Sequence, residues 1–280
     1  MNSKVFVLVH GGGHGGWCFG QVAPYLVREG HAVVSPDLPG HGVNARFPRS
    51  WWSRAQEPGK FAAEPSPTAE LTLTDLAAAV SAVVRQLARP DRQVILVGHS
   101  MAGILLNWAG EAVPELIGRL VYLSGWMTGP GKSFGDYQRT PEIATTEILP
   151  LMLASPGEIG AVRIDFSSAD PAYRQRAKFA FAADVDDDTW DAAAHLLTPD
   201  TPVAAFTEPV HLTASRWGTI PRTYISCTAD RALPPAAQHR FISEADAFTP
   251  ANQTDVRELP TSHSPFLSKP EQLASILVQL

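Results

Sequence analysis

The chain has 280 residues, of which 45% are apolar and 18% are charged, and its formal net charge is −6. This composition excludes a disordered chain, and the length fits one large α/β domain with an inserted subdomain. The sequence contains no basic block and no apolar run near the roughly 20 residues of a membrane helix, so we expect neither a nucleic-acid partner nor a membrane span.

The cysteines and the N-terminus indicate where the protein acts. The two cysteines, Cys18 and Cys227, lie far apart in sequence. A pair of reduced thiols is typical of a cytosolic protein, and the alternative is a single disulfide. The first apolar run, Val5 to Val9, is too short for the core of a signal peptide and predicts a strand instead. We therefore expect a soluble, cytoplasmic protein.

The first part of the chain alternates between strand and helix patterns. Short apolar runs rich in β-branched residues predict strands at 4–10, 31–42, 92–100 and 118–125. Helical spacing of apolar residues predicts helices at 20–30, 72–88 and 101–114. Thr74 is the candidate N-cap of the second of these helices. Such alternation with short connections is typical of a parallel sheet with helices on both faces.

The alternation stops between about 127 and 218, where we find helical pieces and no convincing strand. It resumes with predicted strands at 221–230 and 254–259 and predicted helices at 235–245 and 270–280. We therefore predict an α/β fold: a mostly parallel sheet of about six strands, with an inserted helical cap over the carboxyl edge where such folds bind ligands. The predicted parts are the core at 1–126, the cap at 127–218, and the second part of the core at 219–280.

The segment 44–70 is unusually long for a connection inside a compact domain. It is rich in proline and alanine and carries Trp51 and Trp52. Long loops of this kind are commonly lids or disordered. Two interpretations stay open: a lid over a site, and a surface loop whose aromatic side chains pack against the body of the protein.

The strongest chemical signal is "VILVGHSMAG" at 94–103, a buried strand that runs through Gly98-His99-Ser100 into a helix. This is the context of a nucleophile elbow, where a sharp turn exposes the serine hydroxyl at the end of the sheet. The turn requires small residues around the serine. Here Ala102 replaces the last glycine of G-x-S-x-G, and Gly103 follows it. His99 is expected to support the elbow rather than to react.

A nucleophilic serine needs a base, and four histidines follow Ser100: His195, His211, His239 and His263. Two of these, His195 and His239, lie inside helical patterns, and His211 lies in the predicted cap. His263 follows the last short strand, in "LPTSHSPFLSKP", where a loop can reach back over the sheet edge. We therefore predict His263 as the base.

Asp230 is the predicted acid because it ends the strand pattern "RTYISCTAD", the last long strand before His263. A carboxylate at that end of the sheet is placed to orient an imidazole. The rival acids belong to the run "DVDDDTWD" and are Asp184, Asp186, Asp187 and Asp188. That run resembles the first turn of an exposed helix, where acidic residues suit the helix dipole.

The glycine run at 11–16, broken only by His14, has two interpretations. Its spacing fits G-x-G-x-x-G, a dinucleotide phosphate loop, and Asp37 stands where a ribose-binding acid would. The run could instead aim backbone N–H groups at an oxyanion during acyl transfer. The serine, acid and histidine favour the second interpretation, which makes Asp37 a structural acid. His10 and His14 could bind one zinc ion from the same face of a helix, but the glycines between them prevent a stable helix, so we expect no metal. Acyl transfer by a serine also needs no organic cofactor, and we expect none.

Pieces spread along almost the whole chain resemble the α/β-hydrolase superfamily, in the branch of plant methyl esterases and hydroxynitrile lyases, and also bacterial small-ester hydrolases. They are "FVLVHGGGHGGWCF", "GHAVVSPDLPGHG", "VILVGHSMAG", "LVYLSGWM", "RTYISCTAD" and "SHSPFLSKPEQLASIL". The resemblance implies a catalytic triad of Ser100, Asp230 and His263. It also implies an oxyanion hole formed by the backbone N–H groups of Gly12 and Met101, with the neighbouring Gly13 as an alternative donor.

The sequence departs from the lyase pattern at two positions. Lyase relatives carry a threonine and a lysine where this chain has Gly11 and Ser264. Cyanide release needs a positive charge that Ser264 does not supply, so the departure favours ester hydrolysis. The greater length of the 44–70 segment leaves the substrate preferences of the plant esterases in doubt.

The expected function is hydrolysis of a small carboxylic ester through an acyl-enzyme, on a small-molecule substrate such as a methyl ester with an apolar or aromatic acyl group. Trp126 and Met127 are the predicted pocket residues, with Trp51 or Trp52 as further candidates. The alternatives are a lyase, a biosynthetic cyclase or an inactive binding scaffold of the same fold, and a nicotinamide-dependent dehydrogenase.

Overall fold

The computed structural model describes residues 3–53, 55 and 57–280. Its main sheet has six parallel strands in the order β2-β1-β3-β4-β7-β8. Their bounds are β1 (Ser3–Val9), β2 (Ala32–Val34), β3 (Arg92–His99), β4 (Arg119–Leu123), β7 (Arg222–Cys227) and β8 (Asp255–Leu259). The predicted parallel sheet is therefore confirmed, with every predicted strand of the core in it.

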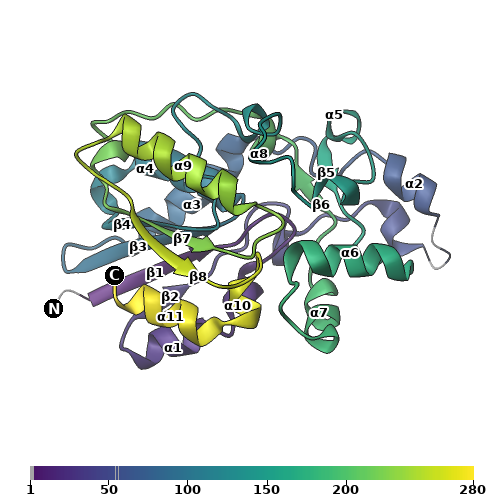
Figure 1. The fold of residues 1–280 in the computed structure, drawn as a ribbon, viewed down its shortest axis with the longest axis horizontal. Helices are drawn as coiled ribbons and strands as arrows, with labels where there is room; N and C mark the ends of the chain where they lie inside the picture. Colours follow the sequence, from purple (N-terminus) through teal and green to yellow (C-terminus); the bar gives the residue numbers. More distant parts are fainter. Residues whose placement is uncertain (1–2, 54, 56) are drawn as a thin grey trace.

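Helices cover both faces of this sheet (Figure 1). One face carries α3 (Leu73–Leu87), α4 (Ala102–Ala112) and α9 (Pro235–Phe248). The other carries α1 (Ala23–Arg28), α10 (Pro265–Ser268) and α11 (Pro270–Val278). The side chains of strand β1 alternate between these two layers of helices. Val5, Val7 and Val9 pack toward the α3 face, and Phe6 and Leu8 pack toward the α1 face. A strand that alternates in this way and is buried on both faces needs apolar residues throughout.

The N-cap of helix α3 lies two residues before the one that the sequence suggested. It is Thr72, not the predicted Thr74. The hydroxyl of Thr72 accepts the backbone N–H of Asp75, and the carboxylate of Asp75 accepts the backbone N–H of Thr72. This reciprocal capping box satisfies two N–H groups at once, which Thr74 does not do.

The chain between β4 and β7 leaves the sheet and lies beyond the carboxyl ends of its strands (Figure 1). Its helices are α5 (Pro156–Ile159), α6 (Pro171–Phe181), α7 (Asp187–Ala194) and α8 (Ala204–Thr207). It also contains two strands, β5 (Ala161–Arg163) and β6 (Asp200–Pro202), which pair antiparallel. The expectation of a purely helical insertion is wrong on this point, because strands of three residues are too short to show periodicity in the sequence.

The segment 44–70 packs against the side of this insertion. It contains a short helix, α2 (Pro58–Ala63), and residues 54 and 56 of the segment lie outside the described residues. The guanidinium of Arg163 in β5 donates to the carbonyl oxygens of Phe61 and Glu64, and the N–H of Ser66 donates to Ile159 O at 2.8 Å. The backbone groups of the segment therefore attach it to the insertion.

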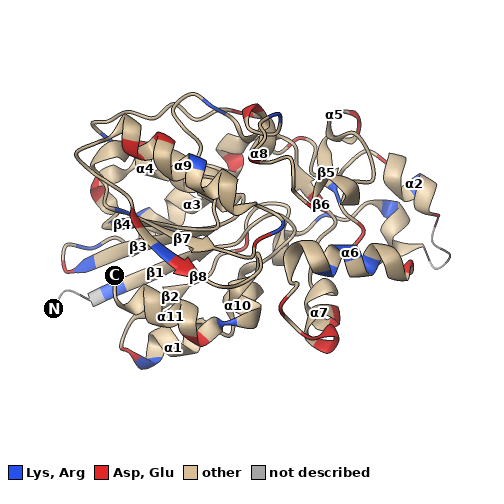
Figure 2. Cartoon of the chain, viewed as in Figure 1, with Lys and Arg blue, Asp and Glu red and all other residues tan. Residues whose placement is uncertain are grey.

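Charged side chains lie mainly on the outer helices and loops, with both signs mixed (Figure 2). Cys18 and Cys227 are buried, free thiols. Within the described residues, no helix combines the length and the apolar character that crossing a bilayer demands.

Candidate active site

The turn between β3 and α4 holds Ser100 in a strained conformation. Its φ is 51°, in the left-handed region that residues other than glycine rarely adopt. Hydrogen bonds hold the turn in place: the N–H of Ser100 donates to Leu123 O at 3.1 Å, and its carbonyl accepts from Gly103 N at 3.0 Å and Trp126 N at 2.9 Å. Such strain persists only where surrounding contacts impose it, and here it presents the hydroxyl to the cavity.

Small residues around Ser100 make this close approach possible. A Cβ on Gly98 would lie 2.5 Å from Leu106 Cδ1 and 3.0 Å from Ala102 O. A Cβ on Gly103 would overlap the backbone N of Trp126 and lie 2.8 Å from Gly125 C. Ala102 is fully buried, and its methyl group is accommodated. The position that excludes a side chain is therefore Gly103.

Asp230 and His263, 33 residues apart in sequence, are in direct contact. Nδ1 of His263 lies 2.7 Å from Asp230 Oδ2. The other carboxylate oxygen accepts the backbone N–H groups of Ala232 and Leu233, both at 2.8 Å, and the hydroxyl of Ser124 donates to Oδ2. Because a carboxylate only accepts, the Nδ1 of His263 carries the proton and Nε2 is left as an acceptor.

The loop that carries His263 is held from below and from the side. Nε2 of His99 lies 2.8 Å from the carbonyl oxygen of His263, which makes His99 a support for the loop. Beside the loop, the carboxylate of Asp184 accepts hydrogen bonds from the backbone N–H and the hydroxyl of Ser262. Asp184 is one of the rival candidates for the acid. Another rival, Asp186, is the N-cap of α7. Both rivals therefore have structural contacts of their own.

Gly12 and Met101 line the same pocket as Ser100 and His263. Within the described part of the chain, neither of their backbone N–H groups donates a hydrogen bond. Gly13, the alternative donor, also lines the pocket; it has a φ of 73°, and its carbonyl accepts from Thr198 N at 2.7 Å. Free N–H groups beside a serine hydroxyl can stabilise a developing negative oxygen.

Asp37 is occupied by the protein's own backbone. Its Oδ1 accepts the N–H of Gly16 at 2.6 Å, and its Oδ2 accepts the N–H of Val43 at 3.0 Å. A Cβ on Gly15 would lie 2.9 Å from Asp37 Oδ1. Asp37 therefore ties the glycine run to the loop after β2. This contact removes the ribose-binding acid that the dehydrogenase interpretation needs.

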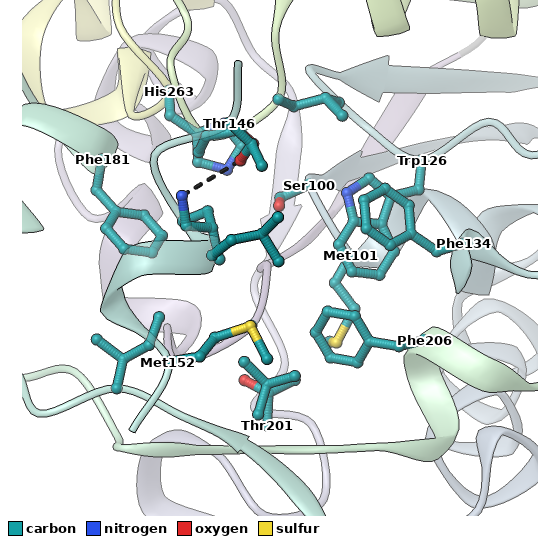
Figure 3. Close-up of a pocket in the computed structure, with 18 of the residues that line it drawn as sticks. Ser100, Met101, Trp126, Phe134, Thr146, Met152, Phe181, Thr201, Phe206 and His263 are labelled. Atoms are coloured by element: carbon teal, nitrogen blue, oxygen red, sulfur yellow. Dashed lines mark hydrogen bonds between the residues drawn. The ribbon is translucent and has the colours of Figure 1, made fainter. Parts of the chain in front are cut away.

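The pocket has an empty volume of about 770 Å³, counting the part open to solvent, which is within the usual range for small-molecule sites. Figure 3 shows the Ser100 hydroxyl pointing into it. Trp126 stacks on Phe134 with ring centroids 3.7 Å apart, and Phe206 meets Trp126 edge-on. Phe181 lies across the cavity from this aromatic wall (Figure 3).

Of the predicted pocket residues, Trp126 lines the cavity and Met127 does not. Met127 is 1% exposed and packs in the core cluster on the α4 face of the sheet. The two tryptophans of the 44–70 segment are also elsewhere: Trp51 lines a separate small pocket with Phe61, and Trp52 is 68% exposed. None of the described residues of the 44–70 segment lines the cavity, so no contact there supports the lid interpretation.

Most of the cavity wall comes from residues that the sequence did not single out. Most of them lie between β4 and β7, among them Phe134, Ile148, Met152, Ile164, Phe166, Phe181, Thr201 and Phe206. A run of aromatic and aliphatic residues in a stretch without regular periodicity is the one sequence signal that they share. It does not say which of them face the cavity.

The electrostatics of the site are those of a neutral cavity. Among the described residues, no Asp, Glu, Lys or Arg lines it. Burial lowers the pKa of His14 to about 4, and burial holds the pKa values of His10 and His99 well below 6.5. These three histidines are therefore uncharged at neutral pH, and His263 is the one histidine of the described residues that lines the cavity.

Comparisons with known proteins agree with this fold. The sequence model described as "Alpha/beta hydrolase family" matches residues 6–276. A pyrethroid hydrolase from Sphingobium wenxiniae is 28% identical over 289 residues, covering 99% of this chain and 87% of that protein. Methylesterase 7 of Arabidopsis thaliana is 25% identical over 281 residues, covering 100% and 96%.

A crystal structure of a pyrethroid hydrolase has the same fold, with a TM-score of 0.76 at 24% identity, covering 100% of this chain and 97% of that one. The family match spans both parts of the sheet and the insertion between them. The chain therefore belongs to the alpha/beta hydrolase family.

Proposed function

We propose that this protein is a serine hydrolase that cleaves small, uncharged carboxylic esters through an acyl-enzyme. The observation that carries the proposal is the hydrogen bond between His263 and Asp230 in the pocket that also holds Ser100 on its strained turn. The relatives named as a pyrethroid hydrolase and a methylesterase support the same reaction class.

In the first half of the reaction, Nε2 of His263 takes the proton from the Ser100 hydroxyl as its oxygen attacks the ester carbonyl. The carbonyl oxygen becomes negative, and the N–H groups of Gly12 and Met101 are the proposed donors to it. Asp230 keeps the imidazole oriented and stabilises its positive charge. His263 then gives the proton to the leaving alcohol, and the acyl group stays on Ser100.

In the second half, water replaces the alcohol. His263 takes a proton from the water, the resulting hydroxide attacks the acyl-enzyme, and the same N–H groups stabilise the second tetrahedral intermediate. His263 returns the proton to Ser100 as the acid product leaves. Every proton in this cycle moves through Nε2 of His263.

The cavity wall supports an apolar, uncharged substrate, such as a methyl ester with an aromatic or aliphatic acyl group. The stacked aromatic wall, and the aliphatic and aromatic side chains that face it, offer dispersion contacts and no counter-charge. The alternative lyase reaction is disfavoured by the same wall: Ser264, which stands where lyases carry lysine, is 1% exposed, and no cationic side chain of the described residues lines the cavity.

Two further features belong to the proposal. The insertion at 127–218 acts as a cap that forms the substrate cavity with the core parts at 1–126 and 219–280. The reaction takes place in the cytoplasm, which the two unpaired cysteines support.

The test is turnover of p-nitrophenyl acetate and butyrate by the unmodified protein, by Ser100→Ala, and by Ser243→Ala as a control at an exposed helix position. We expect burst release of p-nitrophenol that Ser100→Ala abolishes and Ser243→Ala leaves unchanged. A fluorophosphonate should add to Ser100 alone, detected by peptide mass spectrometry. Equal turnover by Ser100→Ala would refute the proposal.

A further inference from the structure

Thr201 brings a hydroxyl group from the insertion to the glycine run. It lies in β6, is 6% exposed, and lines the same cavity as Ser100. A Cβ built on Gly12 would lie 2.8 Å from Thr201 Oγ1 and 3.1 Å from its Cγ2. The threonine side chain therefore contacts the residue whose N–H is the proposed oxyanion donor.

Thr201 lines the cavity, and within the described residues its hydroxyl makes no hydrogen bond. The other threonines nearby are bonded: Thr198 Oγ1 donates to Gly13 O at 3.2 Å, and Thr146 Oγ1 donates to Ala232 O at 2.7 Å. A hydroxyl in a mostly apolar wall is costly unless it finds a hydrogen-bond partner. The partner position for Thr201 is inside the cavity.

The backbone that carries Thr201 is held rigidly. Thr201 pairs with Val162 across the two-stranded sheet. The neighbouring pair, Asp200 and Arg163, forms a buried bidentate ion pair with N–O distances of 2.6 and 2.7 Å. A donor fixed in this way needs little reorganisation when charge develops next to it, which is the condition for electrostatic catalysis.

Thr201 and His263 reach the cavity from different directions. In the view of Figure 3, Thr201 and His263 are on opposite sides of the cavity, with Ser100 between them. The base and the oxyanion donors must flank the reacting carbonyl from different directions, because one contacts the serine hydroxyl and the others contact the carbonyl oxygen.

We propose that Thr201 is a catalytic residue whose hydroxyl donates a third hydrogen bond to the ester carbonyl oxygen, beside the N–H of Gly12. The inference rests on the proposed ester hydrolysis. The hydroxyl keeps its proton throughout, and its hydrogen bond strengthens as the oxygen becomes negative. The insertion thereby supplies part of the oxyanion site as well as the cavity wall.

The test compares Thr201→Val, which keeps the shape and removes the hydroxyl, with Thr201→Ser, which keeps the hydroxyl. We expect Thr201→Val to lower the acylation rate of p-nitrophenyl butyrate about 10- to 100-fold with little change in KM. Thr201→Ser should stay within about threefold of the unmodified protein, and the pH midpoint of kcat/KM should not move. Equal acylation rates in Thr201→Val and the unmodified protein would overturn the inference, as would equal losses in both variants.

A second measurement separates a lost hydrogen bond from a disturbed fold. A trifluoromethyl ketone adds to Ser100 and places a negative oxygen in the same site. Thr201→Val should weaken its binding by the same factor as it lowers acylation, at an unchanged Tm. Equal inhibitor affinity in both proteins contradicts the role of Thr201. Failure of the underlying reaction would appear separately, as full activity of Ser100→Ala.

Discussion

The hydroxyl of Ser124 donates a hydrogen bond to Oδ2 of Asp230, the carboxylate oxygen that also accepts Nδ1–H of His263. Ser124 is fully buried at the end of β4, with a φ of 42°. Among the described residues, Ser100 and Ser124 are the two that have a positive φ without being glycine. A strained serine that contacts the acid is therefore part of what orients the carboxylate.

Replacing Ser124 by alanine should lower kcat/KM about 10-fold, because Oδ2 of Asp230 loses one of its two donors and is held less firmly against His263. Ser124→Gly should lower activity equally, since it also lacks the hydroxyl. The glycine variant should be about 1 kcal/mol more stable than the alanine variant, because glycine adopts positive φ without strain. Steady-state kinetics and urea unfolding measure both effects. Full activity of either variant contradicts the positioning role.

The turn at Ser100 should tolerate change at Ala102 and not at Gly103. Gly103→Ala should destabilise the protein by about 1–3 kcal/mol and lower kcat/KM at least 100-fold, because the methyl group would push Trp126 N away from the carbonyl of Ser100. Ala102→Gly, the matched control, should keep activity within about threefold. Thermal unfolding and p-nitrophenyl butyrate turnover would show the contrast, and similar effects of both changes would contradict it.

The uncharged cavity should discriminate against charged esters. We expect the p-nitrophenyl half-ester of adipic acid to react with a kcat/KM at least 100-fold below that of p-nitrophenyl hexanoate, because its carboxylate would be buried without a counter-charge. Methylation of the free carboxylate provides the control and should restore most of the rate. A half-ester that reacts as fast as the hexanoate would show that the acyl chain does not enter this cavity.

Stability should fall as the pH drops below the ordinary pKa of histidine. His14 has a pKa of about 4 in the folded protein and 6.5 as its usual value, so between these values the unfolded chain binds more protons. Its contribution is complete above pH 6.5 and is lost as the pH falls toward 4. From pH 7.5 to pH 5 this single group should reduce the free energy of unfolding by about 2 kcal/mol.

His14→Phe tests this contribution, because the aromatic ring can keep contacts with Trp17 and Phe266. The difference in free energy of unfolding between pH 7.5 and pH 5 should be smaller in the variant, as measured by urea denaturation at both pH values. The same pH dependence in both proteins would show that His14 does not titrate in this way.

The elements of the core were predictable because each is encoded in neighbouring residues. Buried strands such as β1 and β3 are continuous apolar runs, and α3 repeats its apolar residues at helical spacing. The elbow at Ser100 was recognisable for the same reason, since its small residues lie within a few positions of the serine. Thr74 was wrong as the N-cap because two threonines stand close together, and only the contact with Asp75 distinguishes Thr72.

The cavity was predictable only in part. Trp126 follows shortly after a strand whose end lies at the sheet edge, and it lines the cavity. Met127 and the two tryptophans at 51 and 52 do not, because a side chain's direction in an irregular segment depends on what packs around it. The strands β5 and β6 were not predicted because three residues are too few to show the alternating pattern of a strand.

The sequence by itself determined the parallel sheet, the turn that carries Ser100, and the proposed order of serine, acid and histidine along the chain. These depend on local patterns and on the chemistry of single residues. Only the tertiary structure decided that His263 meets Asp230, that Ser124 contacts the same carboxylate, and that Thr201 lies against Gly12. Those contacts join segments far apart in the chain, and their geometry is set by how the insertion and the sheet pack together.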